Sequence, residues 1–311
     1  MDSAEIKRLV TGAGACACGI ASVSPVSPDE EKLCTGWIAS GKHGAMEYLA
    51  RYQDVRRDPA LLLPGARSII VAAFNYYHRD NGSLHWARYA LGRDYHEEVR
   101  ERLSEVAAML PGEHRVTVDT APLRERYWAV RAGVGFTGLN GLLIVPGTGS
   151  WVVLGEILTT LELEPDSPLA VSGCGNCGRC LSACPGKALD GRGGMDARKC
   201  RSYLSIEYRG EDIPHLGGRV YGCDICQEVC PHNRGARESD IFTPRGEVIS
   251  LSLEDVRGMR QEEFSRLFSH SAIKRTKLSG LLRNALRCGT ESRDGDAGTH
   301  SESLGHTADG D

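Results

Sequence analysis

The stretch Cys174-Gly-Asn-Cys177-Gly-Arg-Cys180-Leu-Ser-Ala-Cys184-Pro185 determines how the second half of this chain folds. A second run, Cys223-Asp-Ile-Cys226-Gln-Glu-Val-Cys230-Pro231, follows it, and Cys200 lies between the two. In chains that bind two [4Fe–4S] clusters, a C-x2-C-x2-C turn supplies three thiolates to one cluster and the other run supplies the fourth. The spacing therefore predicts crossed ligation, with one cluster on Cys174, Cys177, Cys180 and Cys230 and the other on Cys184, Cys200, Cys223 and Cys226.

Structural zinc and disulfides are the two ordinary alternatives for so many cysteines. Zinc closes with four ligands from two separated pairs, whereas this run places its ligands too close together for a zinc ribbon. A disulfide framework is typical of small secreted domains, and the start of this chain shows no secretory signal. We interpret the remaining thiols as small buried hydrophobic residues, namely Cys16, Cys18, Cys34 and Cys288.

Length and composition are those of a globular protein with one large or two ordinary domains. The chain has 311 residues, 41% of them hydrophobic, and no segment approaches the apolar length of a membrane span. Because such clusters are oxygen-sensitive, we expect a cytoplasmic protein without membrane contact. The formal net charge is −4, but residues 291–311 alone contain six acidic residues against one basic residue, so the rest of the chain is close to +1. The nearly neutral remainder does not by itself indicate nucleic-acid binding.

The first 170 residues alternate helix and strand signals. Ser27, Pro28 and Glu30 form a capping box with proline at the first helical position, which predicts a helix over 28–40. Apolar runs predict strands over 67–74, 114–118, 142–145 and 151–158, and helical periodicity predicts helices over 94–110 and 122–131. This alternation indicates the α/β (α+β) class.

Composition changes near 165–172, where polar and turn-forming residues precede the cysteine runs. We therefore expect an α/β domain over 1–170 and a ferredoxin-like two-cluster module over 171–240. A helical segment over 241–288 follows, and it ends in a basic stretch over 273–287. Residues 289–311 lack periodicity and predict a disordered acidic tail.

Residues 133–138, Gly-Val-Gly-Phe-Thr-Gly, satisfy the dinucleotide fingerprint G-x-G-x-x-G. That fingerprint requires a strand before it and a helix after it, and the predicted order here is the reverse. We interpret the glycines as a tight loop or as a close backbone approach to another ligand.

Asp119 lies where a predicted strand ends and a predicted helix begins, the place where open α/β sheets form their ligand crevice. A carboxyl group there is a candidate proton donor, provided that burial keeps it partly protonated. A helix-capping aspartate is about as good an explanation, because Pro122 lies near the first turn. Asp224, between Cys223 and Cys226, has the same two explanations.

Arg56 and Arg88 lie beside aromatic residues in predicted loops, where guanidinium groups could hold phosphates or amides of a bulky ligand. Surface ion pairs are the more ordinary explanation for either one. The basic stretch 273–287 could contact a nucleic-acid backbone. It is equally compatible with an amphipathic helix, because leucines are interleaved with its Lys and Arg residues.

A set of longer segments supports a specific resemblance when taken together and in order. They are HGAMEYLARYQDVRRDPALLLPGARSIIVAAFNYY (43–77), ARYALGRDYH (87–96), VDTAPLRER (118–126), GSWVVLGEIL (149–158), the two cysteine runs, MDARKCRSYLSIE (195–207) and SAIKRTKLSGLLRN (271–284). With these segments, nearly the whole chain to residue 287 resembles the epoxyqueuosine reductases, the last enzymes of queuosine synthesis.

The resemblance implies an enzyme that removes the epoxide oxygen of epoxyqueuosine at the wobble position of tRNA. Its catalytic α/β domain would be nitroreductase-like and bind base-off cobalamin. Two [4Fe–4S] clusters would pass electrons to the cobalamin and reduce it to cob(I)alamin. The clusters would receive these electrons from a low-potential donor of flavodoxin or ferredoxin type. Carried over by motif, Asp119 is the proton donor, and the residues expected to line the corrinoid are Arg56, Arg88, Asp119, Asn140, Trp151, Ser202 and Asp224.

The chain departs from the expected patterns at three places. Asp94-Tyr95-His96 lacks the glycine of the D-x-H-x-x-G motif, so we expect base-off cobalamin without a histidine ligand. Leu139 stands where the family commonly has lysine, and a helical repeat extension found in many members is missing. The tRNA interpretation therefore depends on residues 273–287 and on surfaces that the sequence does not identify.

Three other functions remain as alternatives. A reductive dehalogenase would share the cofactors, but those proteins usually carry a twin-arginine signal, which Met1 to Val10 lacks. A plain electron-transfer iron–sulfur protein would leave the α/β domain without a purpose. An RNA-binding module with structural clusters would bind the anticodon stem-loop but form no reduced product.

Overall fold

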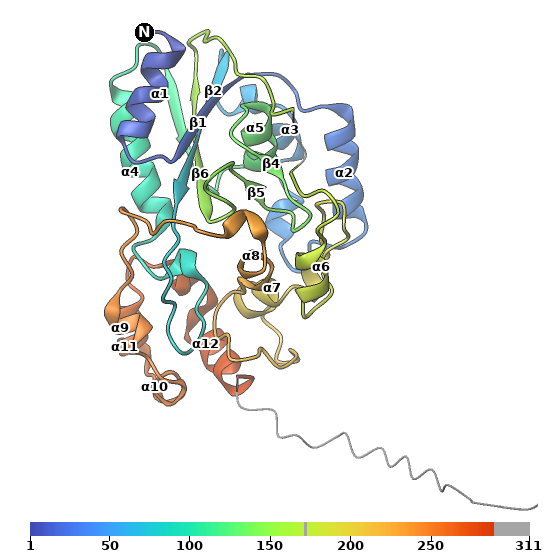
Figure 1. The fold of residues 1–311 in the computed structure, drawn as a ribbon, viewed down its shortest axis with the longest axis vertical. Helices are drawn as coiled ribbons and strands as arrows, with labels where there is room; N and C mark the ends of the chain where they lie inside the picture. Colours follow the sequence, from blue (N-terminus) through green and yellow to red (C-terminus); the bar gives the residue numbers. More distant parts are fainter. Residues whose placement is uncertain (171–172, 289–311) are drawn as a thin grey trace, which may run out of the picture.

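The computed structural model describes residues 1–170 and 173–288, and its centre is a four-stranded antiparallel sheet (Figure 1). The strands β1 (Ala17–Ser22), β2 (Ser68–Asn75), β6 (Val152–Thr159) and β3 (His114–Thr117) follow one another in that order across the sheet. β2 and β6 pair over their full length, from Ser68 opposite Thr159 to Asn75 opposite Val152. Both strands are mostly apolar because helices cover both faces of the sheet, and Glu156 is the charged exception in β6.

Side chains of β2 point alternately into two separate cores. Ile70 and Phe74 pack with α1 (Ser3–Gly12) and α4 (Tyr95–Ala108) on one face. Ile69 and Val71 pack with α5 (Glu125–Arg131) on the other face. Helices α4 and α5 therefore lie on opposite faces of the sheet. Their first residues lie on either side of the end of β3.

A third core lies beyond the end of the sheet (Figure 1). It joins α7 (Arg201–Ile206), α10 (Leu253–Gly258), α11 (Gln261–Leu267) and α12 (Lys277–Leu286). Trp86 and Leu91, from the segment before α4, are fully buried in this core. The α/β part of the chain therefore contributes a segment of its own to the C-terminal region.

The other elements are mostly short. β4 (Phe136–Thr137) and β5 (Leu143–Ile144) form a small antiparallel pair. The remaining helices are α2 (Pro28–Ala39), α3 (Gln53–Arg57), α6 (Arg179–Ala183), α8 (Ile225–Glu228) and α9 (Gly246–Ile249). No helix in the described part of the chain has the length and apolarity to span a membrane.

Most elements predicted from the sequence are present, and the differences have local causes. Ser27 caps α2 as predicted, with its hydroxyl oxygen accepting from the Glu30 N–H. The helix predicted over 122–131 begins only at Glu125, because the preceding residues form an irregular loop. The sequence analysis predicted neither α1 nor β1. The predicted tail over 289–311 lies outside the described residues.

The antiparallel pairing corrects one argument about Asp119. All neighbouring strands of the main sheet run in opposite directions, so a crevice rule for open α/β sheets does not apply. Asp119 nevertheless follows the end of β3, in the loop between β3 and α5. Its position results from the packing of α4 and α5 around that strand end.

Two glycine substitutions test how closely the helices approach the sheet. A Cβ atom on Gly19 in β1 would collide with the carbonyl oxygen of Ala132 at the end of α5. We expect Gly19→Ala to destabilise the fold by about 1–3 kcal/mol, the usual cost of overpacking. Gly36→Ala in α2 meets nothing within 4 Å, so it should stabilise the fold by about 0.5–1 kcal/mol. Apparent melting temperatures measured anaerobically should shift in opposite directions, and equal shifts would contradict this packing.

Candidate cluster sites and catalytic site

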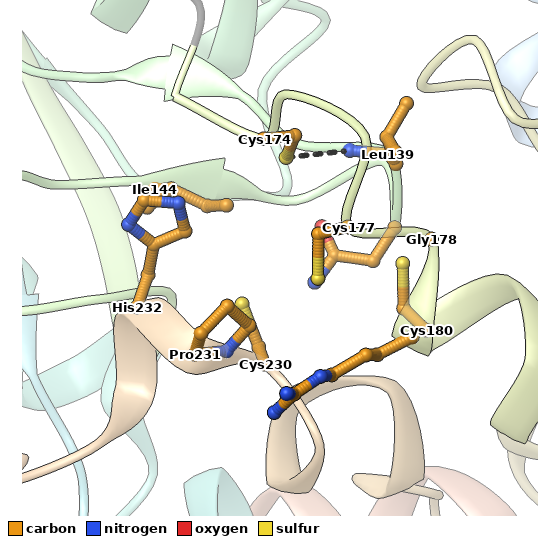
Figure 2. A pocket seen from close by; sticks show the side chains of 11 residues that line it. Leu139, Ile144, Cys174, Cys177, Gly178, Cys180, Cys230, Pro231 and His232 are labelled. Atoms are coloured by element: carbon orange, nitrogen blue, oxygen red, sulfur yellow. Dashed lines mark hydrogen bonds between the residues drawn. The ribbon is translucent and has the colours of Figure 1, made fainter.

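Four cysteines from separate segments surround one space in the cluster module (Figure 2). Cys174 and Cys177 lie before α6, Cys180 lies within it, and Cys230 follows α8. Leu139, Ile144 and His232 also line this space. The structure thus brings together the first set of predicted ligands, including the one from the second run.

The other four cysteines also interact with one another. Burial raises the pKa of the Cys226 thiol, and the charges of Cys223, Cys200 and Cys184 raise it further. Cys230, by contrast, is affected by the first run, since burial and then the charge of Cys174 raise its pKa. These mutual effects run within the two sets predicted from the spacing, and iron binding would have to displace protons from the buried thiols.

Backbone amides donate to one sulfur in each set. The Leu139 N–H donates to Cys174 Sγ at 3.4 Å, which is the dashed line in Figure 2, and the Ala188 N–H donates to Cys184 Sγ at 3.4 Å. Hydrogen bonds of this kind stabilise thiolate charge and tune cluster potentials. Leu139 makes its contact through the backbone, so the absence of lysine at this position does not remove it.

The glycine-rich loop 133–138 allows a close contact between backbone segments. As predicted, a helix precedes it and a strand follows it. A Cβ atom on Gly135 would lie 2.5 Å from the carbonyl oxygen of Ile144, so the close approach is to the chain's own backbone. The tight-loop interpretation is therefore the one that the structure supports.

A buried ion pair joins the cluster module to the α/β part. Arg88 donates through its backbone N–H and its guanidinium group to Asp224 Oδ2, at 2.9 and 3.3 Å, and also contacts Glu228 at 2.9 Å. The guanidinium carbon lies 5.1 Å from the centre of the Trp151 ring. Burial raises the pKa of Asp224 to about 6, although Arg88 opposes this shift. Asp224 is thus the partner of Arg88, and its side chain does not cap α8.

Asp119 is held in a strained conformation by groups from α4 and α5. Its φ of +52° is in the left-handed region, which is uncommon for a residue other than glycine. Its backbone N–H donates to Glu125 Oε1, and its Oδ2 lies 2.9 Å from His96 Nε2. The helix-cap explanation fails because α5 begins six residues later, with Arg124 at its N-cap. Strain of this kind is typical of functional sites.

The carboxyl groups around this loop have pKa values shifted in opposite directions. Burial raises the pKa of Asp119, but the hydrogen bond and charge of His96 outweigh it, so its net pKa lies below the ordinary value. Burial and then the charge of Asp119 raise the pKa of Glu125. Burial and the charge of Glu125 raise that of Glu156, which is fully buried in β6. His96 therefore opposes the partial protonation of Asp119 that its role as proton donor requires.

Basic and aromatic side chains form the rim around Asp119. Arg275 forms a bidentate ion pair with Glu207, with both N···O distances at 2.9 Å, and its guanidinium carbon lies 5.4 Å from the centre of the Tyr48 ring. Arg56 donates to the backbone carbonyl of Tyr48. The charge of Asp119 acts on Tyr48, Arg56 and Arg275 alike, which indicates that these groups face one site.

The predicted corrinoid-lining residues are divided among several parts of the structure. Arg88, Trp151 and Asp224 form the buried ion-pair cluster, and Arg56 lies on the rim of Asp119. Asn140 lines the first cysteine set, and Ser202 lies in α7 directly after Cys200. The sequence analysis did not assign roles to four residues that lie in this site, namely Tyr48, His96, Glu125 and Glu207. All four lie inside the quoted segments, but no pattern distinguished them.

Single cysteine variants test the crossed sets. Cys230→Ala and Cys226→Ala should each lower the iron content from about eight to about four atoms per chain, because each removes one ligand from one cluster only. The matched control is Cys16→Ser, since Cys16 belongs to neither set and its Sγ donates to the carbonyl of Ala73; this residue is exposed, so its interpretation as a buried hydrophobic residue was wrong. Iron analysis after anaerobic reconstitution gives the measurement. Loss of iron in the control, or full iron content in both alanine variants, would contradict the assignment.

Two family models match the chain. Residues 56–120 match "Epoxyqueuosine reductase QueG, DUF1730", and residues 173–233 match "4Fe-4S double cluster binding domain". The first range includes Arg56, Arg88, His96 and Asp119, and the second includes all eight cysteines of the two runs.

Solved structures of one family share the fold. The epoxyqueuosine reductase from Streptococcus thermophilus superposes with a TM-score of 0.82 at 30% identity, covering 92% of this chain and 80% of that one. An epoxyqueuosine reductase crystallised with an epoxyqueuosine-modified tRNA-Tyr stem loop gives 0.81 at 28% identity, with the same coverage.

Curated relatives are similar over nearly their whole length. The epoxyqueuosine reductase of Gloeobacter violaceus is 41% identical over 303 residues, which cover 91% of this chain and 94% of that protein. That of Cyclobacterium marinum is 38% identical over 296 residues, covering 90% and 94%. With this identity and coverage, the chain belongs to the epoxyqueuosine reductase family.

Proposed function

We propose that this chain reduces the epoxide of epoxyqueuosine in tRNA to the alkene of queuosine, with two [4Fe–4S] clusters as electron carriers and cobalamin as cofactor. The observation that carries the proposal is Asp119, a strained and half-exposed carboxylate beside the predicted corrinoid-lining residues. Family membership and the double-cluster model support the same conclusion. Removal of an epoxide oxygen as water requires two electrons and two protons.

The second cysteine set is the better candidate for the last electron-transfer step. Asp224 lies between Cys223 and Cys226 and is bound to Arg88, which packs on Trp151. Ser202 follows Cys200 in α7. Electrons from a low-potential donor of flavodoxin or ferredoxin type would therefore enter at the first set, which opens to the surface near Arg179, and leave from the second.

The residues present fit a corrinoid, whose edge carries many amides and a phosphate. The Trp151 Nε1–H and one Asn140 Nδ2 donor are buried without a hydrogen-bond partner among the described residues. Arg56 bonds only to backbone carbonyls, so its charge lacks a carboxylate partner in the described structure. These groups, with Ser202, would hold the ring, and the bound cofactor would supply a low-potential metal centre that can break a C–O bond. Both ring nitrogens of His96 face carboxylates, which supports binding without a histidine ligand.

Asp119→Asn tests the predicted proton donor. Opening the epoxide places negative charge on its oxygen, and an amide does not deliver a proton to it, so turnover should fall by about a hundredfold or more. Mass spectrometry of the tRNA nucleosides measures the product. The iron content should stay at the wild-type level, because Asp119 contacts neither cysteine set, and the cobalt content should stay there because asparagine keeps the size and shape of the side chain. Wild-type turnover in this variant would remove Asp119 from the role.

The exposed basic groups near the rim are candidates for binding the tRNA backbone. Lys274 and Lys277 are exposed, and neither forms an ion pair among the described residues. Tyr48, 41% exposed beside Arg275, offers a face for base stacking. Arg283 does not take part, because it is buried and donates to the carbonyls of Leu204, Tyr208 and Gly210. The basic stretch is thus divided between a structural arginine and an exposed surface.

Lys274→Ala should weaken binding of an anticodon stem-loop several-fold and lower the slope of log affinity against log salt by about one, because one phosphate contact is lost. Arg8→Ala removes an equal charge from exposed α1, far from α12 in Figure 1, and is the matched control. Fluorescence anisotropy at several salt concentrations gives both quantities. Equal slopes for both variants would place the tRNA on another surface.

A further inference from the structure

His96 connects two carboxylates at the start of α4. Its Nδ1 lies 2.6 Å from Asp94 Oδ1, and its Nε2 lies 2.9 Å from Asp119 Oδ2. Asp94 is the N-cap of α4 and also accepts from the His96 backbone N–H at 3.0 Å. The Tyr95 ring stacks on the imidazole with centres 4.0 Å apart. The ring is therefore fixed in place, and each nitrogen faces an acceptor.

The charges that surround His96 favour its protonated form. From α4 it faces Asp94 and Tyr95, from the loop after β3 Asp119, and from α5 the carboxyl of Glu125. His270 acts on the far side of Asp94 and pairs with Glu97, and Arg275 acts on Asp119. Burial lowers the pKa of His96, but the hydrogen bonds and charges of the two aspartates outweigh it and raise the pKa to about 9.

The resting site near neutral pH is then an imidazolium between two carboxylates. Asp119, the group placed to meet the epoxide oxygen, has no proton of its own in this state. The proposed reaction nevertheless consumes two protons in each turnover. A proton source must therefore lie within hydrogen-bond reach of Asp119, and the ring nitrogen of His96 is at 2.9 Å from its Oδ2.

We propose that His96 is a positioning residue that holds the proton delivered by Asp119, while Asp94 fixes its tautomer. This inference rests on the proposed function. As negative charge develops on the epoxide oxygen, the Nε2 proton moves to Asp119 Oδ2 and from there to that oxygen. His96 is left neutral, with its Nδ1–H still donated to Asp94. Solvent then reprotonates the ring, which is 24% exposed, and supplies the second proton by the same route.

The proton balance of the step is complete. Both carbon–oxygen bonds of the epoxide break, a carbon–carbon double bond forms, and the oxygen leaves as water. Two electrons from the clusters and two protons from His96 through Asp119 account for the water formed. Asp119 returns to its carboxylate form after each transfer.

The test compares His96→Gln and Asp94→Asn with the wild type in the cluster-loaded, cobalamin-loaded full chain. Single-turnover rates are measured against pH on an epoxyqueuosine-containing anticodon stem-loop. The wild-type rate should hold up to about pH 9 and fall above it, as the imidazolium deprotonates. His96→Gln should lose about tenfold or more and move the alkaline limb down by at least about one pH unit. Asp94→Asn should give a smaller shift in the same direction.

His114→Gln is the matched control, because His114 contacts only the carbonyl of Leu110 and should leave the profile unchanged. A rate loss in His96→Gln with an unchanged pH profile would overturn the proposal, since it would show a merely structural role. Nitrogen-15 NMR of the imidazole in iron-loaded, corrinoid-free protein gives an independent readout. A protonated ring at pH 7 in wild type is expected, and a neutral ring would overturn the proposal. If wild type forms no queuosine, the proposed function fails, while the NMR titration still decides the state of His96.

Discussion

Crossed ligation is the constraint on which the rest of this structure depends. Each cysteine run supplies ligands to both predicted clusters, so neither run completes a site without the other. The chain between Cys184 and Cys223 must therefore leave and return, and α7 lies in that excursion and packs into the third core. Because binding energy at such sites is also folding energy, iron binding and the packing of the C-terminal helices are coupled.

The Arg88–Asp224 ion pair connects the cysteine runs to the part of the chain that contacts Asp119. Arg88 lies in the segment that continues through Asp94 into α4, and α4 carries His96. A buried ion pair contributes little net stability, because desolvation offsets the attraction between its charges. Its role here is geometric, since it sets the position of the α4 N-terminus relative to the clusters. Asp119 then takes its strained conformation between His96 and Glu125.

The sequence predicted the positions of the cysteine ligands better than the electrostatics around Asp119. Cysteine spacing is a local property with few solutions, and the four cysteines predicted for one cluster line a common space in the structure. Helix α2 was predicted within one residue because the Ser27 cap and Pro28 at the first helical position are also local signals, although the Ser27 N–H donates to Tyr127 and not to Glu30 as a capping box requires. The effect of His96 on the pKa of Asp119 was not predicted, because the two residues are 23 positions apart and meet only after α4 packs on the sheet. The burial of Arg283 could not be predicted either, since its partners are the carbonyls of Leu204 and Tyr208, which are far away in the sequence.

The central claim is that paired clusters serve a cobalamin-dependent removal of an epoxide oxygen beside Asp119. The most direct measurement is anaerobic reconstitution with iron, sulfide and cobalamin, followed by metal analysis and mass spectrometry of epoxyqueuosine-containing tRNA under low-potential reductant. We predict about eight iron atoms and about one cobalt atom per chain, with epoxyqueuosine converted to queuosine. Protein that binds iron yet retains no cobalt and leaves the epoxide intact would contradict the account.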